Sequence, residues 1–98
     1  MAIVNHSQLL PWNEHNIQQA PDATGVYELG DSTGHLLYVG RTIEPRRLRR
    51  RLLEHWRLKD IPGVANFAWY QTDSEESAAA IEADWIKKHQ PPYNIQGR

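Results

Sequence analysis

Two short apolar runs that flank a turn limit the folds open to this chain more than any other feature. Residues 25–29 and 35–39 each read as a strand, and the Asp31-Ser32-Thr33-Gly34 cluster between them has the residues of a tight turn. Two strands joined so closely pair antiparallel, because a parallel pair needs a long crossover connection. The hairpin therefore favours an α+β fold built on an antiparallel sheet.

A helix is predicted from Glu44-Pro45 to about Leu58. Proline favours the first position of a helix, where its missing N–H costs nothing. Leu48, Leu52 and Trp56 fall at i, i+4 and i+8 and give the helix an apolar stripe. This stripe should pack on the sheet.

A third strand and a second long helix follow. Residues 66–72 alternate in the manner of a strand. Asp73 with Glu76 has the form of a capping box, and the helix that it opens should end near His89, before Pro91-Pro92. The predicted fold is α+β: a three-stranded antiparallel β-sheet flanked by helices, in the order strand, strand, helix, strand, helix.

Residues 1–24 are predicted to be an N-terminal extension that packs on the core. Leu9, Leu10 and Trp12 can contribute apolar surface, and a short helix is expected over residues 13–19.

At 98 residues the chain has room for one core, so residues 1–98 are treated as a single domain. The absence of cysteine excludes disulfides and thiolate chemistry. The chain shows neither a signal-peptide pattern nor an apolar run of membrane length, which predicts a cytoplasmic protein without a membrane partner.

The formal charge of −1 hides a strong segregation of charge along the chain. Residues 41–59 carry eight basic and two acidic side chains, whereas residues 1–40 and 60–86 carry only acidic ones. A phosphate responds to this local field rather than to the total. The pattern indicates a nucleic-acid partner that binds weakly and in a salt-sensitive way.

Two tyrosines and two helix residues are candidates for one site. Tyr27 and Tyr38 lie on the two strands of the hairpin, and a nearby positive field can lower the pKa of a phenol. Arg51 borders the apolar stripe, and His55 lies one turn further on the same edge. The plain alternatives are strand aromatics, a solvated arginine face and a packing histidine.

Two further candidates lie near the C-terminus. Glu82 lies at the margin of the second helix's apolar stripe, and a carboxylate there, together with water and phosphate, suits Mg²⁺. The alternative is an ordinary surface acid. Asn94 can hydrogen-bond into the site or simply form a turn.

Taken in order, these residues resemble the GIY-YIG nuclease superfamily. Gly25-Val26-Tyr27 and Tyr38-Val39-Gly40 match its two tripeptides, and Pro91-Pro92-Tyr93-Asn94 matches its closing motif. Arg51, His55 and Glu82 match the positions between these motifs. The match covers residues 25–94, and it is similar to the catalytic domains of homing endonucleases and to the N-terminal nuclease domain of the excision-repair incision protein.

The resemblance implies a metal-dependent phosphodiesterase that contains no organic cofactor. It makes Glu82 the ligand of Mg²⁺ or Mn²⁺, and it places the two tyrosines around the attacking water without deciding which is the base. The loop after Gly40 is longer than the usual family pattern, so Arg47 and Arg50 remain open as alternatives to Arg51, although the leucine register favours Arg51. The implied catalytic residues are Tyr27, Tyr38, Arg51, His55, Glu82 and Asn94, and the implied substrate-binding residues are Arg41, Arg46, Arg47 and Arg50.

The expected activity is therefore that of a DNA endonuclease with little intrinsic sequence specificity, with branched and single-stranded DNA among its candidate substrates. DNA repair is one candidate pathway, and restriction, mobile-element transposition and DNA uptake stay open beside it. A homodimer or a recruiting protein is left open. Two alternatives remain: a non-catalytic nucleic-acid-binding module that retains the fold, and a protein-interaction domain that uses its Trp residues.

Overall fold

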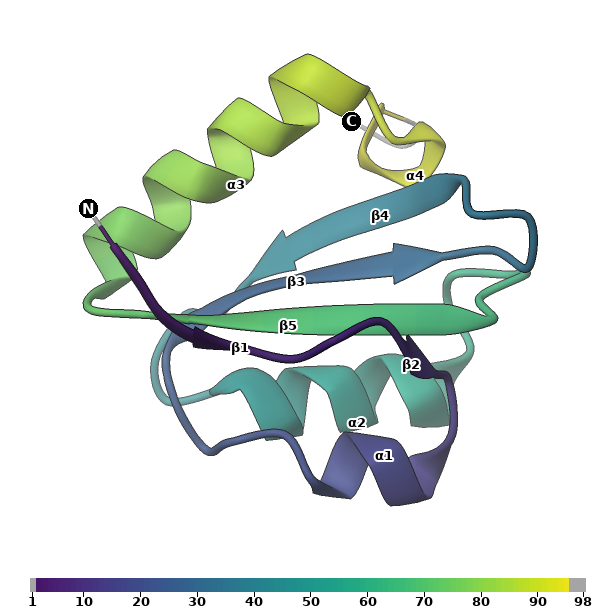
Figure 1. The fold of residues 1–98 in the computed structure, drawn as a ribbon, viewed down its shortest axis with the longest axis horizontal. Coiled ribbons are helices and arrows are strands. Elements are labelled where there is room, and N and C mark those ends of the chain that lie inside the picture. Colours follow the sequence, from purple (N-terminus) through teal and green to yellow (C-terminus); the bar gives the residue numbers. More distant parts are fainter. Residues whose placement is uncertain (1, 96–98) are drawn as a thin grey trace.

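An antiparallel sheet with helices on both faces makes up the computed structural model, which describes residues 2–94 in full and the backbone of Ile95 (Figure 1). In chain order its elements are β1 (Ile3–His6), β2 (Leu10–Pro11), α1 (Glu14–Gln18), β3 (Gly25–Gly30), β4 (Leu36–Arg41), α2 (Leu48–Leu58), β5 (Asn66–Thr72), α3 (Glu75–His89) and α4 (Pro92–Ile95). The strand order is β1-β5-β3-β4, and β2 pairs with another part of β5. Residues 1 and 96–98, the ends of the predicted single domain, lie outside the described residues.

The predicted α+β class, the β3–β4 hairpin and β5 are confirmed, but the prediction of three strands is wrong. The N-terminal extension adds β1 and β2, which both pair antiparallel with β5. All four residues of β1 are exposed, so hydrogen bonds to β5 rather than burial hold this strand. A strand without a buried face has no alternating pattern that the sequence could reveal. In the strand order β1-β5-β3-β4, β4 pairs with β3 alone and forms an edge of the sheet.

The predicted start of α2 at Glu44-Pro45 is wrong, because the helix begins at Leu48. A tight turn precedes it, in which the Arg46 N–H donates to the carbonyl of Ile43 at 2.9 Å. The Leu48 N–H then donates to the carbonyl of Ala23 at 2.9 Å, which fixes the helix start against the chain before β3. The predicted stripe is confirmed, with Leu48 fully buried under the sheet.

The predicted capping residue of α3 is displaced by one position. Ser74, not Asp73, is the N-cap, and its hydroxyl accepts from the Ser77 N–H at 3.0 Å. The predicted end at His89 is confirmed: Gln90 takes the left-handed conformation there, with φ 44°. The short helix α4 follows at once.

The two faces of the sheet bury different layers. Towards α1 and α2 the core contains the fully buried side chains Ile17, Tyr27, Leu29, Leu48, Leu52 and Phe67. Towards α3 it contains Val26, Ala78 and Ile81. The predicted packing of the N-terminal extension is confirmed for Leu10 and Trp12, which contact the first layer, but not for Leu9, which is 67% exposed.

Candidate active site

Two glycines allow the sheet to approach its neighbours closely. Gly40 lies opposite Tyr27 in the β3–β4 ladder, and a Cβ added to Gly40 would overlap the end of the Tyr27 ring, coming within 2.8 Å of its Cε1. A Cβ at Gly25 would overlap the backbone carbonyl of Tyr70 and come within 2.9 Å of the Leu48 side chain. Both positions therefore require glycine for space, and Gly40 in particular makes room for the Tyr27 phenol.

Tyr27 is fully buried, and its hydroxyl takes part in a network with α2. The Tyr27 Oη and the His55 Nε2 lie 2.8 Å apart. Burial raises the pKa of the Tyr27 hydroxyl well above its ordinary value, and the Arg51 guanidinium, which hydrogen-bonds the hydroxyl, offsets this only in part. Tyr27 is therefore a neutral phenol at physiological pH.

Tyr38 lies diagonally from Tyr27 on the same face of the hairpin, because it pairs with Leu29. The ring centroids of Tyr38 and Tyr27 are 6.3 Å apart, and those of Tyr38 and His55 are 5.4 Å apart. Tyr38 is only half-buried and belongs to the edge strand. Of the two tyrosines it is the one that solvent can reach.

Arg51 is the α2 arginine that faces this cluster. Its side chain is 24% exposed, and its Nη1 donates to the Glu54 carboxylate at 2.6 Å. Glu54 also lies within 3.8 Å of Arg46 and 3.7 Å of Arg50. Glu54 was not predicted as a site residue, and its carboxylate contacts three arginines.

The other predicted arginines lie further out on the protein. Arg46 and Arg50 have side chains 56% and 62% exposed, and Arg47 donates to Glu44 at 3.0 Å. Of the three arginines considered for the site, Arg51 is the one that reaches Tyr27, so the geometry favours it over Arg47 and Arg50.

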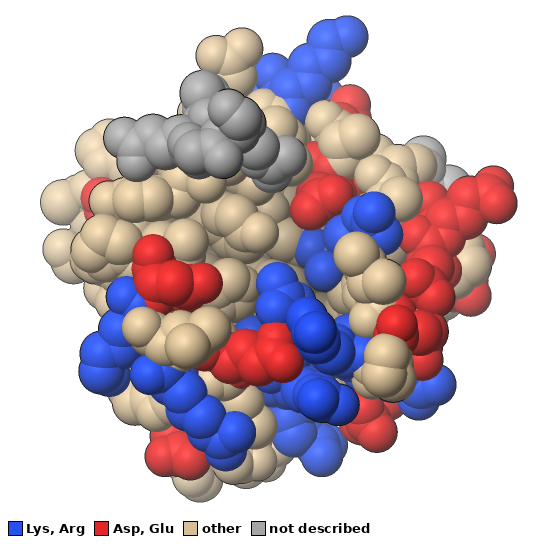
Figure 2. All heavy atoms as spheres, turned by 180° about the vertical axis from the view of Figure 1, so that it is seen from behind, with Lys and Arg blue, Asp and Glu red and all other residues tan. Residues whose placement is uncertain are grey.

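Figure 2 shows basic side chains gathered over the lower part of one face, where α2 lies in Figure 1, with acidic side chains among them. Acidic side chains dominate the side of that view on which α3 lies. The segregation of charge seen along the sequence is thus also a segregation in space.

Glu82 enters the site from α3, on the other side of the hairpin. Its Oε1 accepts from the Arg41 Nε at 3.2 Å, and its side chain is 21% exposed. Its negative charge also acts on the Tyr27 hydroxyl, which places it near the tyrosines electrostatically. Arg41, predicted to bind substrate, is therefore also the partner that holds the predicted metal ligand.

Asn94 hydrogen-bonds the backbone of the edge strand β4. Its amide oxygen accepts from the Val39 N–H at 2.7 Å, and its amide nitrogen donates to the Val39 carbonyl at 2.8 Å. Asn94 is 3% exposed. It links α4 to β4 beside Tyr38, so the structure shows it holding the strand, and its catalytic role stays a prediction.

Asp60 is a second residue that the sequence analysis did not select. Its carboxylate oxygens lie 2.8 and 3.0 Å from the His55 Nδ1. The two residues are five positions apart, a spacing that no regular helix brings together on one face. Only the position of the helix end, at Leu58, could have revealed the contact.

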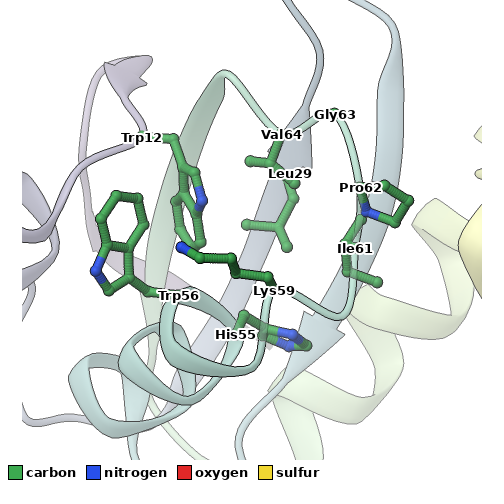
Figure 3. A pocket seen from close by; sticks show the side chains of 9 residues that line it. All are labelled: Trp12, Leu29, His55, Trp56, Lys59, Ile61, Pro62, Gly63 and Val64. Atoms are coloured by element: carbon green, nitrogen blue, oxygen red, sulfur yellow. The ribbon is translucent and has the colours of Figure 1, made fainter.

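An apolar pocket of about 350 Å³ opens on the far side of His55 (Figure 3). Trp12 and Trp56 line one side of it, and Ile61 and Val64 line the other. His55 thus stands between this pocket and the polar cluster, and its ring is 6% exposed.

The predicted site residues thus fall into three groups. Tyr27, Tyr38, Arg51 and His55 form one connected cluster at the β4 edge, with Glu82 close to it. Asn94 is the second group and hydrogen-bonds the backbone of Val39 at this edge. The third group, further out on the protein, is Arg46, Arg47 and Arg50.

The model of the UvrC-like GIY-YIG domain family matches residues 23–95, which include every member of this cluster. The chain belongs to this family. The predicted membership of the GIY-YIG nuclease superfamily is thereby confirmed.

Similar proteins include the UvrABC system protein C of Synechocystis sp., which is 34% identical over 91 residues. Those of Moorella thermoacetica and Trichlorobacter lovleyi are 34% identical over 89 residues and 35% identical over 88 residues. These matches cover 84%, 84% and 82% of this chain, but only 14% of each relative. The chain therefore spans only a small part of the length of these relatives.

In the part of the chain that the structure describes, no helix is both long and apolar enough to cross a membrane.

Proposed function

We propose that this protein is a divalent-metal-dependent endonuclease that hydrolyses phosphodiester bonds of DNA. The observation that carries the proposal is the connected cluster of Tyr27, Tyr38, Arg51 and His55 at the open edge of β4, with the Glu82 carboxylate beside it. Phosphoryl transfer needs positioning and charge stabilisation more than covalent chemistry, and this cluster supplies both.

The two tyrosines have different roles in this proposal. Tyr38 is half-buried on the edge strand, so its hydroxyl can contact a water that attacks the phosphorus. Tyr27 is fully buried and keeps its proton, because burial raises its pKa. Tyr27 is therefore a positioning residue that connects Arg51 and His55 to the site.

Arg51 is the residue that would stabilise the negative charge of the transition state. It is partly exposed, and it pairs with the Glu54 carboxylate at 2.6 Å. A guanidinium presents two parallel donors to phosphate oxygens. Arg46, Arg47 and Arg50, further out on the α2 surface, would contact the backbone of the nucleic acid, which supports binding with little sequence preference.

Glu82 is the residue that would hold the metal ion. Across the described residues, no group of three or more His, Asp or Glu side chains is placed to hold a metal ion. Glu82 supplies one carboxylate, and Mg²⁺ is commonly held by one or two carboxylates together with waters and substrate phosphates. A bound Mg²⁺ or Mn²⁺ would lower the pKa of water and offset charge on the phosphate.

Within this site Arg41 would hold the Glu82 carboxylate in place, since their side chains are 3.2 Å apart. The likeness to UvrABC system protein C extends the proposal to DNA repair, where branched and single-stranded DNA are natural test substrates.

The test is a cleavage assay with the whole chain on supercoiled plasmid, single-stranded DNA and branched DNA, in Mg²⁺, Mn²⁺ or chelator. We expect cleavage that stops in chelator and is lost in Glu82→Gln, whereas DNA affinity is retained because α2 is untouched. Asp84→Asn is the matched control: it lies on the same helix, is 55% exposed and pairs with Lys88.

Absence of cleavage by the wild-type protein under all these conditions would reject the endonuclease in favour of a binding module. Cleavage by Glu82→Gln at the wild-type rate would reject the role of Glu82. Equal loss of binding and cleavage in Glu82→Gln would mean that the carboxylate supports the DNA-binding surface instead.

A further inference from the structure

We propose that Asp60 is a positioning residue, which fixes the tautomer of His55 and so the direction of the hydrogen bond between His55 and Tyr27. The role in catalysis rests on the proposed endonuclease function, whereas the tautomer itself does not.

The two nitrogens of the His55 ring have different partners. Nδ1 lies 2.8 and 3.0 Å from the Asp60 carboxylate oxygens, and Nε2 lies 2.8 Å from the Tyr27 hydroxyl. An ionised carboxylate only accepts hydrogen bonds. Nδ1 therefore carries the proton, and in the neutral ring Nε2 is left as an acceptor.

The Tyr27 hydroxyl completes the chain of donors. Its pKa is raised by burial, so it has a proton to donate to Nε2. The Arg51 guanidinium donates to the same hydroxyl oxygen. Every partner in the sequence Asp60, His55, Tyr27, Arg51 then has one direction of donation, and a doubly protonated His55 would instead direct two cationic donors at one hydroxyl.

The backbone explains how Asp60 reaches the ring. Lys59 takes the left-handed conformation with φ 51°, and its N–H donates to the His55 carbonyl at 2.9 Å. This turn ends α2 and brings the next residue, Asp60, back towards His55. The loop continues beside His55 as one side of the apolar pocket in Figure 3.

Exposure makes Asp60 suitable for a test. Its side chain is 43% exposed, whereas the His55 side chain is 6% exposed. Removing the carboxylate charge therefore changes the ring's hydrogen bonding without opening a cavity in the core. Figure 1 places the α2 end and its loop at the side of the sheet, away from α3.

Without the Asp60 carboxylate, His55 is no longer held in the Nδ1–H tautomer. An Nε2–H ring would instead donate to the Tyr27 hydroxyl, which would then have to direct its own proton elsewhere, and this would change the hydrogen bonding between Tyr27 and Arg51. Removing the hydrogen-bond partner of a metal-bound histidine typically costs about 10- to 100-fold in activity, and we expect a loss of the same size for His55. The kcat should fall by this factor, whereas DNA affinity should not change, because the α2 arginines remain in place.

The experiment compares wild type, Asp60→Asn and Asp60→Glu as whole chains labelled with ¹⁵N-histidine. Long-range ¹H–¹⁵N spectra report which ring nitrogen of His55 carries the proton. Single-turnover cleavage and DNA affinity are measured on the same samples, with Asp84→Asn as the control. We expect Nδ1–H in wild type, loss of this single tautomer in Asp60→Asn with kcat about 10- to 100-fold lower, and retention of Nδ1–H with most of the activity in Asp60→Glu.

An Nε2–H or doubly protonated His55 in wild type at neutral pH would overturn the inference, and so would a changed tautomer in Asp60→Asn with unchanged kcat. A matching loss of activity in Asp60→Glu that keeps Nδ1–H would also contradict it. A wild-type protein that never cleaves DNA would reject the endonuclease function, and the spectra would still decide the tautomer.

Discussion

Gly40→Ala tests whether the glycine of the second tripeptide exists to make room for Tyr27. The new Cβ would overlap the Tyr27 Cζ and hydroxyl and come within 2.8 Å of Cε1. Neither partner can move freely. The Tyr27 ring is fully buried and bonded to His55 at 2.8 Å, and β4 is held by two hydrogen bonds between Asn94 and Val39.

The size of the effect follows from these contacts. Overpacking a well-filled site costs about 1–3 kcal/mol, and a buried hydroxyl that loses its partner costs about 1–3 kcal/mol. Alanine returns about 0.4–1 kcal/mol by restricting the unfolded chain. We therefore expect a net loss of about 3 kcal/mol, within a range of about 1–5 kcal/mol, which a domain of typical stability survives at the centre of that range.

Cleavage should fall further than stability does. A displacement of about 1 Å in a reacting group costs roughly 100-fold in rate. DNA affinity should remain near that of wild type, because Gly40 does not contact the α2 arginines that carry the basic surface.

Urea denaturation, single-turnover cleavage and DNA binding measure the three quantities. Gly30→Ala is the matched control, since it also lies in the β3–β4 hairpin and its added Cβ would approach only the His35 carbonyl, at 3.2 Å. If Gly40→Ala is no less stable than Gly30→Ala and cleaves DNA equally well, the space argument for Gly40 is refuted.

Two further predictions concern the same cluster. The pKa of Tyr27 is raised in the folded state above its ordinary value of 10.0, so its contribution to stability is full below pH 10 and is lost as the pH rises further. Between pH 10 and about 11.5 the free energy of unfolding, measured with urea, should therefore fall with pH more steeply in wild type than in Tyr27→Phe, by up to about 1.4 kcal/mol per pH unit. Equal slopes would contradict the buried phenol. Glu54→Gln should tighten DNA binding by about fivefold, because it frees Arg46, Arg50 and Arg51 from ion pairs worth at most about 1 kcal/mol; fluorescence anisotropy that shows unchanged or weaker binding would contradict this.

The elements with a buried face were predictable from the sequence, and those without one were not. The β3–β4 hairpin and β5 have clear patterns because their side chains enter a core. The consecutive residues Val26 and Tyr27, for example, enter the two core layers on opposite faces of the sheet. Strand β1 is exposed along its whole length, so nothing in its side chains marks it. The start of α2 was misplaced because Pro45 lies in the turn before the helix, where its fixed φ is equally acceptable.

The site divides in the same way. A motif can match positions that follow one another in a fixed order, as those of Tyr27, Arg51 and Glu82 do. The spacing of the leucines favoured Arg51, and Arg51 is the arginine that reaches Tyr27 in the structure. Asp60 and Glu54 depend on where α2 ends and on how its side chains fold back. Asn94 lies in the motif, but its bonds to the backbone of Val39 are a tertiary feature that no spacing reveals.

The near-neutral charge of the chain has a structural counterpart in the site. Arg41 is paired with Glu82, and Arg51 is paired with Glu54, so each cation nearest the β4 edge already has a carboxylate partner. A phosphate that binds to Arg51 replaces the Glu54 carboxylate as its partner instead of meeting an unpaired cation. The gain in free energy is then a difference between two ion pairs, which is smaller and more easily screened by salt than either alone. We therefore expect weak, salt-sensitive binding from the pairing within the site as well as from the total charge.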